Sequence, residues 1–519
     1  MEKFDVPHIV LPDVITSHAK WRPTKIALVC GEKRLTWREF NQRINRVANG
    51  LIKSGLQRGD KVSALLTNSI EMAEIIFGTI KAGGVIVPLS SMVPGEGLAM
   101  MINDSDSRCL FVGPKLDGLL IPYRERLQNI PKENFFSVGF EAPGWNSYQG
   151  WLRDASDQEP MSPLTYEDDF NIIYSSGTTG VPKGIVHTHF ARAHFALGLA
   201  ADFRIDSSSV SILTTPMYAN GTWMTFLPTI LTGGTLVIMP QFDPKAFLEL
   251  VQKERCTHTF MVPTQFIVIM SLPDLNQYDL SSMKIMISAA APLRQDTKEQ
   301  ILRTFKCGLL ELYGVTEGIG TTLKPEEMEG KIASVGTPIM GGDIRIIDDQ
   351  GQELPRGEIG EIVGYGATLM RGYYKQPEKT AETIWRDERG RTYLKTGDVG
   401  KLDEDGYLYI LDRKKDMIIS GGINIFASDI EEVFAKHPEV MDVAVIGVPH
   451  EIWGETPVAL VIRRKGGSVQ EEALKEWANP KLAKYQRVSR VKFVDTFPRN
   501  ALGKVLKRQL RESYRERAQ

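Results

Sequence analysis

The chain has 519 residues and a formal net charge of −2, with 42% hydrophobic and 24% charged residues, the proportions of an ordinary globular protein. Its length exceeds what one hydrophobic core usually serves, so two or more domains are expected. The near-neutral charge gives no reason to expect a nucleic-acid partner. Four separated cysteines without a CxxC pair indicate reduced thiols. The chain shows neither a secretory signal nor the ~18 consecutive apolar residues of a membrane span, so a cytoplasmic location is expected.

The first half of the chain alternates strand-like and helix-like patterns. Residues 62–66 form a short apolar run, and residues 72–80 carry apolar side chains at helical spacing. Asn68 and Glu71, three positions apart, indicate a capping box where this helix begins. Further strand-like runs are 85–89, 235–239 and 284–287. The alternation predicts an α/β fold with a parallel sheet and covering helices.

The second half has a different texture. From Ile344 onward, short strands separated by Gly-containing turns predict a β-rich subdomain. A charged cluster at 412–416 is followed by a predicted helix at 429–436 and strands at 443–448 and 457–462. The predicted domains are a large N-terminal domain at 1–411, a hinge at 412–416 and a small, mobile C-terminal α+β domain at 417–519.

The strongest chemical signal follows the strand-like run at 172–174. The next ten residues, SSGTTGVPKG, contain four hydroxyl groups, three glycines and Lys183. Glycines let backbone N–H groups turn toward an anion, hydroxyl groups add donors, and the lysine adds positive charge. The segment predicts a polyphosphate site, although its spacing differs from that of the GxxxxGK[ST] loop. A plain Gly/Ser turn is the weaker interpretation.

Five motifs in this order resemble those of the adenylate-forming superfamily, which includes acyl-CoA synthetases, aryl-CoA ligases, firefly-type luciferases and the adenylation domains of peptide synthetases. The resemblance covers nearly the whole chain. The motifs lie at 174–184, 313–317, 393–398, 412–416 and 498–504. The resemblance implies that ATP activates a carboxylic acid as an acyl-adenylate, with AMP and pyrophosphate as products.

The resemblance also implies roles for individual residues. Glu317 would be an oxygen ligand of Mg²⁺ on the ATP phosphates, and Thr316 would donate to the α-phosphate. Asp398 would accept hydrogen bonds from both ribose hydroxyls, with Arg413 beside it. Lys504 would stabilise the charge that builds up during adenylation. The residues expected to bind ATP are Ser175, Ser176, Gly177, Thr178, Thr179, Lys183, Ala289, Ala290, Ala291, Pro292, Tyr313, Gly314, Asp398 and Arg413.

A second step is implied by the hinge. In the superfamily the small domain rotates after adenylation, at the position that aligns with Lys415. Ser420, Gly421 and Gly422 would then line a narrow channel for the thiol of coenzyme A. The chain ends soon after Lys504, so a free thiol is the expected acceptor. A separate carrier protein is the alternative acceptor, and a homodimer is left open.

The loop at 215–223 bears on the acid. It contains no carboxylate that could pair with an amino group, which argues against an α-amino acid. Gly314 stands where acetate-type members close the pocket with Trp, and Ala219 stands where many acyl-CoA synthetases have His. We therefore expect a medium or longer aliphatic, alicyclic or aryl carboxylate. The expected pocket residues are Met217, Tyr218, Asn220, Trp223, Met261 and Gly314, although plain core packing explains Met217 and Met261 equally well.

Three other interpretations of the sequence can be tested. An oxidative luciferase-like enzyme is a further alternative within the superfamily. An ATPase or kinase would release ADP rather than AMP, and an inactive nucleotide-binding module would be expected to lack Glu317, Asp398 or Lys504. His187 and His189 form an H-x-H pair without a third nearby ligand, so a structural or pocket-lining role is expected rather than metal binding.

Overall fold

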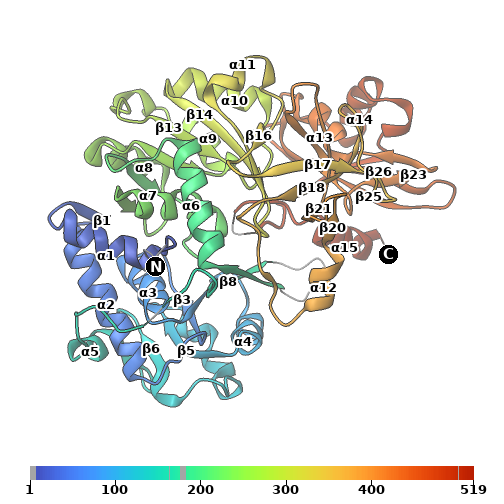
Figure 1. Cartoon of the computed structure of the whole chain (residues 1–519). Coiled ribbons are helices and arrows are strands. Elements are labelled where there is room, and N and C mark those ends of the chain that lie inside the picture. The colour runs from blue at the N-terminus through green and yellow to red at the C-terminus, as the bar shows by residue number, and fades with distance from the viewer. Residues whose placement is uncertain (1–6, 163, 176–182, 501, 519) are drawn as a thin grey trace. The chain divides into compact units, whose positions relative to one another are not determined.

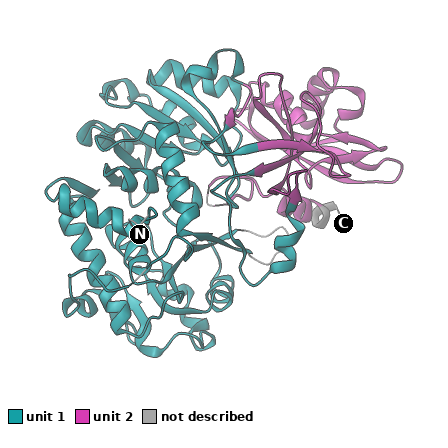
Figure 2. Cartoon of the chain, in the orientation of Figure 1, with its two compact units in different colours: residues 1–332, 338–343, 365–384 teal, residues 333–337, 344–364, 385–519 magenta. Residues whose placement is uncertain are grey.

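The computed structural model describes residues 7–162, 164–175, 183–500 and 502–518, and its chain is an α/β fold, as predicted (Figure 1). Two compact units divide the chain (Figure 2). Unit 1 comprises residues 1–332, 338–343 and 365–384, and unit 2 comprises residues 333–337, 344–364 and 385–519. Unit 2 therefore includes strands on both sides of the 412–416 cluster, and the domain boundary at 411 stays a prediction. No helix among the described residues is long and apolar enough to cross a membrane.

Unit 1 contains a nine-stranded sheet. Its strands, in spatial order, are β16 (Thr337–Pro338), β15 (Gly320–Leu323), β14 (Gly308–Gly314), β13 (Ile285–Ser288), β12 (His258–Met261), β10 (Val210–Leu213), β11 (Thr235–Ile238), β1 (Ile26–Cys30) and β2 (Lys33–Thr36). The pairs from β14 to β1 are parallel, whereas β15 pairs antiparallel with β14 and β2 pairs antiparallel with β1. The predicted strands at 235–239 and 284–287 are thus β11 and β13.

An eight-stranded sheet forms the rest of the framework of unit 1. Its order is β19 (Gly372–Tyr373), β9 (Lys183–Thr188), β8 (Asp169–Ser175), β4 (Val85–Pro88), β3 (Lys61–Leu65), β5 (Ser107–Val112), β6 (Phe135–Ser137) and β7 (Asn146–Ser147). β3 pairs parallel with β4 and β5, which confirms the predicted βαβ unit. β9 runs antiparallel to both β8 and β19, so the edge containing the phosphate segment departs from the parallel pattern.

Helices cover and separate these sheets. They are α1 (Leu11–Trp21), α2 (Trp37–Lys53), α3 (Ile70–Lys81), α4 (Gly95–Asp104), α5 (Tyr148–Arg153), α6 (His189–Phe203), α7 (Trp223–Thr232), α8 (Pro244–Glu254), α9 (Pro263–Met270), α10 (Gln295–Phe305), α11 (Met328–Lys331) and α12 (Pro377–Glu382). One hydrophobic core joins α2, α3, α6 and α7 to strands of both sheets. The apolar faces of these helices are therefore buried on both sides, which fixes the two sheets relative to each other.

The predicted capping box of α3 is wrong in its cap residue. Ser69 is the N-cap, and its side chain accepts a hydrogen bond from the backbone N–H of Met72. Asn68 instead donates to the carbonyls of Thr215 and Met239, and it accepts from the backbone N–H of Met217. The amide of Asn68 is recruited by loops that are distant in sequence, so a local capping pattern could not reveal its role.

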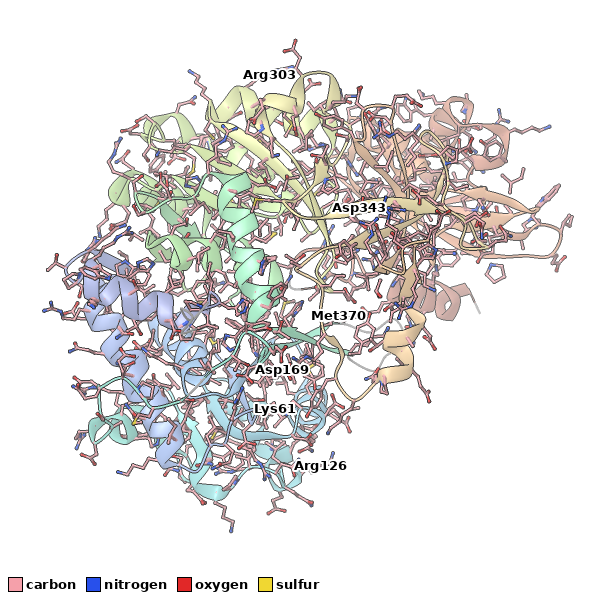
Figure 3. The ribbon with its side chains drawn as sticks, viewed as in Figure 1. Lys61, Arg126, Asp169, Arg303, Asp343 and Met370 are labelled. Atoms are coloured by element: carbon pink, nitrogen blue, oxygen red, sulfur yellow. The ribbon has the colours of Figure 1, made fainter. Side chains whose placement is uncertain are left out.

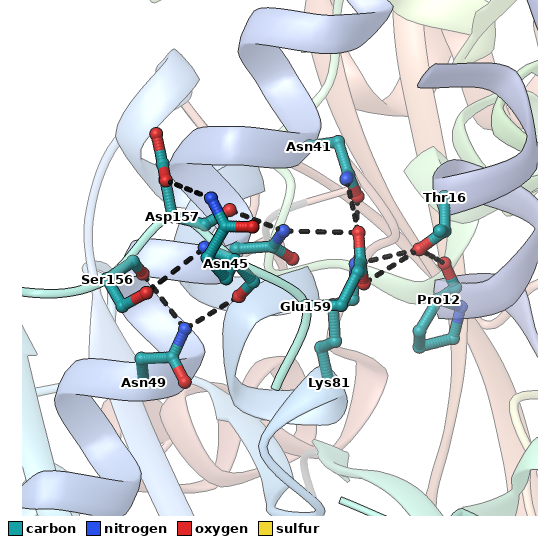
Figure 4. Close-up of polar contacts among 10 residues, drawn as sticks. Pro12, Thr16, Asn41, Asn45, Asn49, Lys81, Ser156, Asp157 and Glu159 are labelled. Carbon is teal, nitrogen blue, oxygen red and sulfur yellow. Dashed lines mark hydrogen bonds and ion pairs between the residues drawn. The ribbon is translucent and has the colours of Figure 1, made fainter. Parts of the chain in front are cut away.

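A polar network fastens the segment before β8 to α2 and α3 (Figure 4). The ammonium of Lys81, which is almost fully buried, lies 2.6 Å from the carboxylate of Glu159 and donates to Asn41 and Thr16 at 2.8 Å each. Asn45 donates to Glu159 at 3.1 Å and to the Asp157 carbonyl. These bonds satisfy a buried cation that would otherwise be costly.

Unit 2 contains two smaller sheets. The first is β17 (Asp343–Ile347), β18 (Gly360–Tyr365), β21 (Thr392–Leu402) and β20 (Ile384–Arg386), with β22 (Leu408–Arg413) paired to β21. The second is β24 (Ile423–Ile425), β23 (Ile418–Ser420), β26 (Gly454–Arg463) and β25 (Val440–His450), with β27 (Arg490–Phe493) paired to β26. Its helices are α13 (Ala427–Ala435), α14 (Glu471–Ala478) and α15 (Lys507–Ala518). The β-rich texture predicted from Ile344 onward is confirmed.

Candidate active site

The predicted phosphate segment connects β8 to β9 in unit 1. Ser175 and Lys183 are paired in the antiparallel register where the two strands end and begin. Ser176, Gly177, Thr178 and Thr179 lie outside the described residues. The Nζ atom of Lys183 lies 4.6 Å from the centroid of the Tyr373 ring, a distance typical of a cation–π contact. The lysine is therefore held at the base of the segment by an aromatic ring.

Thr316 and Glu317 lie in the turn between β14 and β15, also in unit 1. Gly318 follows them with a φ of +112°, and a Cβ atom there would lie 1.9 Å from the carbonyl oxygen of Thr368. Only glycine fits this approach. The backbone N–H of Met370, labelled in Figure 3, donates to the carbonyl of Glu317 at 2.7 Å. The turn is thus fixed by the segment that leads into β19.

The carboxylate of Glu317 has a specific partner. The hydroxyl of Tyr373 donates to its Oε1 atom at 2.9 Å, whereas no described residue bonds to Oε2. Burial and the charge of Glu317 raise the pKa of Tyr373, so the hydroxyl stays protonated and donates. A single carboxylate with an oxygen to spare fits Mg²⁺, which takes one or two carboxylates together with substrate phosphates.

The segment that carries Tyr373 is itself anchored to β8. Arg371 forms an ion pair of 2.9 Å with Asp169, the first residue of that strand, which is labelled in Figure 3. Because β19 also pairs with β9, Tyr373 lies next to both Lys183 and Glu317. Unit 1 therefore brings together two predicted site residues through a third that the sequence did not reveal.

The predicted adenine wall is the loop after β13. Ala289 is buried, Ala291 is half-buried, and Ala290 and Pro292 are exposed. Ala290 has a φ of +73°, which is unfavourable for any residue with a Cβ atom. The loop is held by Glu311 of β14, which accepts from the backbone of Leu293 and forms a buried ion pair with Lys298. Burial raises the pKa of Glu311 in spite of that ion pair.

Asp398 and Arg413 lie opposite each other on β21 and β22 of unit 2. Nε of Arg413 lies 3.3 Å from a carboxylate oxygen of Asp398, which is 4% exposed. The antiparallel register thus joins two residues that the sequence assigned to the same ribose. A carboxylate in this position can accept from both hydroxyls of a vicinal diol.

Lys504 also belongs to unit 2. The side chain of Asn500 accepts from the backbone N–H groups of Leu502 and Lys504, and this shapes the loop. Burial, followed by the charge of Arg413, lowers the pKa of Lys504 to about 8, while Asp398 acts in the opposite direction. Lys504 is therefore close enough to the Asp398–Arg413 pair to share its electrostatic field.

The charges of Arg413 and Asp398, which act on Lys504, also act on the predicted hinge residue Lys415. Burial and the neighbouring Arg413 lower its pKa. On either side of it, Lys414 bonds to Glu361 at 3.0 Å, and Asp416 pairs with Arg511 of α15 at 2.9 Å. Rotation at Lys415 stays a prediction.

The glycines predicted to face coenzyme A form a hairpin turn in unit 2. Ser420 ends β23, and Gly421 and Gly422 connect it to β24 with φ values of +57° and +80°. Two-residue turns with positive φ at both positions strongly favour glycine. A Cβ atom at Gly421 would lie 2.9 Å from the ring of Trp453, while nothing lies within 4 Å at Gly422. The geometry explains the glycines without a ligand, and the contact with coenzyme A stays a prediction.

The residues predicted for the acyl pocket are mostly buried. Met217, Trp223 and Met261 are at most 1% exposed, and Tyr218 is 8% exposed. Met217 and Trp223 belong to the core between the two sheets, and the indole of Trp223 donates to the Met217 carbonyl at 2.7 Å. Core packing therefore explains these two residues. Asn220 differs, because its buried Oδ1 atom has no hydrogen-bond partner among the described residues.

Gly314 has a backbone explanation as well. A Cβ atom there would lie 2.6 Å from the carbonyl oxygen of Ile319, because β14 and β15 form a tight hairpin. The glycine is therefore required by the hairpin, independently of the size of the acid.

The two histidines of the H-x-H pair have different surroundings. His187 is hydrogen-bonded on both nitrogens, whereas neither nitrogen of the buried His189 has a partner among the described residues. Burial lowers the pKa of His189 to about 4. No group of three potential metal ligands occurs among the residues that the structure describes.

The fold and these residues define the chain as an adenylate-forming enzyme. More specifically, it belongs to the family of AMP-binding enzymes, since the AMP-binding enzyme family model matches residues 15–374 and that of the AMP-binding enzyme C-terminal domain matches residues 429–504. It is an AMP-forming acid–thiol ligase and binds ATP.

Relatives cover nearly the whole chain. A feruloyl-CoA synthase of Amycolatopsis sp is 33% identical over 500 residues, which are 96% of this chain and 97% of that protein. A fatty acid–[acyl-carrier-protein] ligase of Streptomyces coeruleorubidus is 30% identical over 530 residues, covering 99% and 98%. The crystal structure of ATP-bound MatB from Rhodopseudomonas palustris superposes with a TM-score of 0.88 at 32% identity, covering 98% and 100%.

Proposed function

We propose that the chain joins a medium-to-long aliphatic, alicyclic or aryl carboxylic acid to coenzyme A through an acyl-adenylate. The observation that carries this proposal is the grouping of Lys504 with Asp398 and Arg413 in unit 2. A cation beside the ribose pair would stabilise negative charge at the α-phosphate of the same nucleotide. This arrangement favours nucleotidyl transfer over γ-phosphoryl transfer.

In the first step a carboxylate oxygen attacks the α-phosphorus of ATP. The new O–P bond forms as the bond to the bridging oxygen breaks, and pyrophosphate leaves. In unit 2, Lys504 would offer its charge to the reacting groups, and Asp398 and Arg413 would hold the ribose. In unit 1, Lys183 and Thr316 would contact the phosphates. Mg²⁺ held by Glu317 would neutralise phosphate charge.

In the second step the sulfur of coenzyme A attacks the acyl carbonyl carbon. The thiol loses its proton, the thioester bond forms, and AMP leaves with the electrons of the broken acyl–oxygen bond. Ser420, Gly421 and Gly422 would border the path of the thiol. A turn without side chains at two positions allows a close approach of a narrow chain.

The acid class is supported by two features. The loop at 215–223 offers no carboxylate to an ammonium group. By their names, one relative makes feruloyl-CoA and the Streptomyces relative acts on a fatty acid. Asn220 has an unsatisfied buried oxygen, which could accept a hydrogen bond from a polar group of the acid.

A separate acyl carrier protein is the second candidate acceptor. The observation that favours it is the Streptomyces relative, whose name gives an acyl carrier protein as acceptor. The two acceptors share the terminal phosphopantetheine thiol, so the adenylation step is the same for both.

The test is pyrophosphate release across a panel of carboxylic acids, with and without coenzyme A. Lys504→Ala should abolish release, and it should spare thioester formation from supplied acyl-AMP. Lys484→Ala, at an exposed lysine of the same unit, is the matched control. No release by the wild-type chain with any acid would overturn the proposal, and equal loss of both steps in Lys504→Ala would overturn the assigned role.

A further inference from the structure

Three buried polar side chains form a closed hydrogen-bonded ring beside the turn that carries Glu317. Asn171 of β8, His187 of β9 and Arg192 of α6 are each at most 1% exposed. Arg192 donates from Nε to Asn171 Oδ1 at 2.7 Å, and its Nη2 lies 3.2 Å from His187 Nδ1. The amide nitrogen of Asn171 lies 3.3 Å from the same Nδ1 atom. No step of the proposed reaction uses these residues.

The ring has one link to the candidate site. Nε2 of His187 lies 2.9 Å from the backbone carbonyl of Thr316. A carbonyl only accepts, so Nε2 carries the proton and donates. Nδ1 must then be the acceptor, which matches the two donors that face it. Burial and the charge of Arg192 hold the pKa of His187 well below its usual value, which keeps this neutral tautomer.

The buried charge of Arg192 distinguishes the ring from ordinary core packing. No carboxylate among the described residues pairs with it, and its guanidinium lies 4.8 Å from the Trp223 ring and 5.4 Å from the Phe195 ring. Burial lowers its pKa to about 9. A buried cation without a counter-charge is costly, and an apolar side chain could fill the same space. Holding His187 in this ring therefore lowers the free energy of unfolding relative to apolar packing at the same place.

We propose that His187 is a positioning residue: through the Thr316 carbonyl it fixes the orientation of Thr316 and Glu317 toward the metal-bound nucleotide. The proposal rests on the proposed function and deepens it. The turn is then held from two directions, by His187 at Thr316 and by Met370 and Tyr373 at Glu317. Two anchors determine where the carboxylate lies, and small misplacements of such groups cost about 100-fold in rate.

The experiment compares three variants. His187→Leu removes both hydrogen-bonding functions, whereas His187→Gln retains a donor and an acceptor on one amide. The matched control is His258→Leu, because His258 is also a buried unit 1 histidine bonded to a backbone carbonyl, that of Phe203 at 3.1 Å. Burial lowers the pKa of His258 to about 4, so its neutral state matches that of His187. Its side-chain hydrogen bonds go to Thr257 and Phe203 and not to the turn between β14 and β15.

Binding of ATP is measured by calorimetry at several Mg²⁺ concentrations, which requires no acid substrate. His187→Leu should weaken binding and raise the Mg²⁺ requirement about 10-fold or more. His187→Gln should recover most of the loss, and His258→Leu should bind like the wild type although its melting temperature falls. Equal binding by His187→Leu and His258→Leu would overturn the proposal.

Misfolding of His187→Leu and failure of the proposed function can each be distinguished from failure of the role assigned to His187. If His187→Leu does not fold, His187→Asn replaces it, because the shorter amide can still bond within the ring but cannot reach Thr316, and the same weakening is expected. Unchanged binding by His187→Asn would also overturn the proposal. If no acid supports pyrophosphate release, the proposed function fails, and the binding measurements still decide the role of His187.

Discussion

The hydroxyl of Tyr373 donates a hydrogen bond of 2.9 Å to the carboxylate of Glu317. The ring of the same tyrosine lies 4.6 Å from the ammonium of Lys183, at the base of the phosphate segment. One side chain therefore sets the separation between a predicted phosphate ligand and the predicted magnesium ligand. Its two functions, ring and hydroxyl, can be separated by substitution.

Tyr373→Phe should raise the KM for Mg·ATP while preserving the ring contact with Lys183. A hydrogen bond to a charged group contributes about 1.5–3 kcal/mol, so we expect a rise in the KM for Mg·ATP of roughly 10-fold or more. Pyrophosphate exchange at varied Mg·ATP is the measurement. Tyr374→Phe is the control, since its hydroxyl bonds to Asp106 at 2.9 Å. A similar KM change in both variants would contradict the assigned role.

The adenylation step should lose rate at alkaline pH. The pKa of Lys504 is lowered to about 8, so the charged form that the step needs is lost as the pH rises through that value. The kcat/KM of pyrophosphate exchange should fall about tenfold per pH unit above it. Bound nucleotide adds negative charge, so the corresponding limb in kcat should lie at higher pH. Thioester formation from supplied acyl-AMP should lack this limb.

A control for the pH profile is Lys504→Arg. The guanidinium stays charged throughout the range, so the variant should be slower overall because of its different shape, and it should show no alkaline limb. An unchanged limb in Lys504→Arg would assign the titration to another group.

Asp398→Asn should weaken ATP binding. The amide keeps the shape, but it loses the charge that pairs with Arg413 at 3.3 Å and one of the two acceptors for the ribose. Loss of a bond to a charged acceptor corresponds to about a 10-fold or larger rise in the dissociation constant for ATP. Calorimetry with ATP is the check. Glu432→Gln, which removes the partner of the exposed Lys436, should leave ATP affinity nearly unchanged.

The network in Figure 4 should contribute to stability rather than catalysis. Lys81→Ala leaves Asn41 and Glu159 without their cation, so we expect a loss of about 1–3 kcal/mol in the free energy of unfolding. Urea titration measures it. Because Lys81 belongs to the scaffold of unit 1, the KM for Mg·ATP of the folded variant should stay unchanged.

The same network predicts an acid-sensitive component of stability. Burial alone would raise the pKa of Glu159, but the bonds from Lys81 and Asn41 hold it below the usual value. Its contribution is therefore present above the unfolded-state pKa of about 4.3 and is lost as the pH falls through the lower folded-state value. Glu159→Gln should differ from the wild type in stability at neutral pH, and this difference should shrink in acid. A constant difference would contradict the prediction.

Local pattern was enough to predict the main elements but not their polar details. The helix at 72–80 and the strand at 443–448 appear as α3 and β25, because their apolar spacing reflects burial directly. The prediction that Asn68 caps the helix is wrong because its partners, Thr215 and Met239, come from distant loops. Long-range backbone groups leave no trace in a short sequence window.

The site residues that lie within sequence motifs were predictable. Asp398 and Arg413 were assigned to one ribose, and the register of β21 and β22 pairs them. Tyr373 was not predictable, because it reaches Lys183 only through the pairing of β19 with β9, two strands that are far apart in the sequence. Gly314 shows the opposite case, in which a residue read as a pocket feature is explained by the approach of the Ile319 carbonyl.

The turn with Glu317 is held by two segments that lie far apart in the sequence. The order of synthesis on the ribosome therefore limits when this turn can be fixed in place. His187 is synthesised well before Glu317, but Met370 and Tyr373 emerge more than fifty residues after it. A nascent chain released before Gly372 would contain the phosphate segment and Glu317 without the strand that aligns them. Nucleotide could then stabilise the nascent chain only late in synthesis, because the predicted ribose ligands Asp398 and Arg413 are made later still.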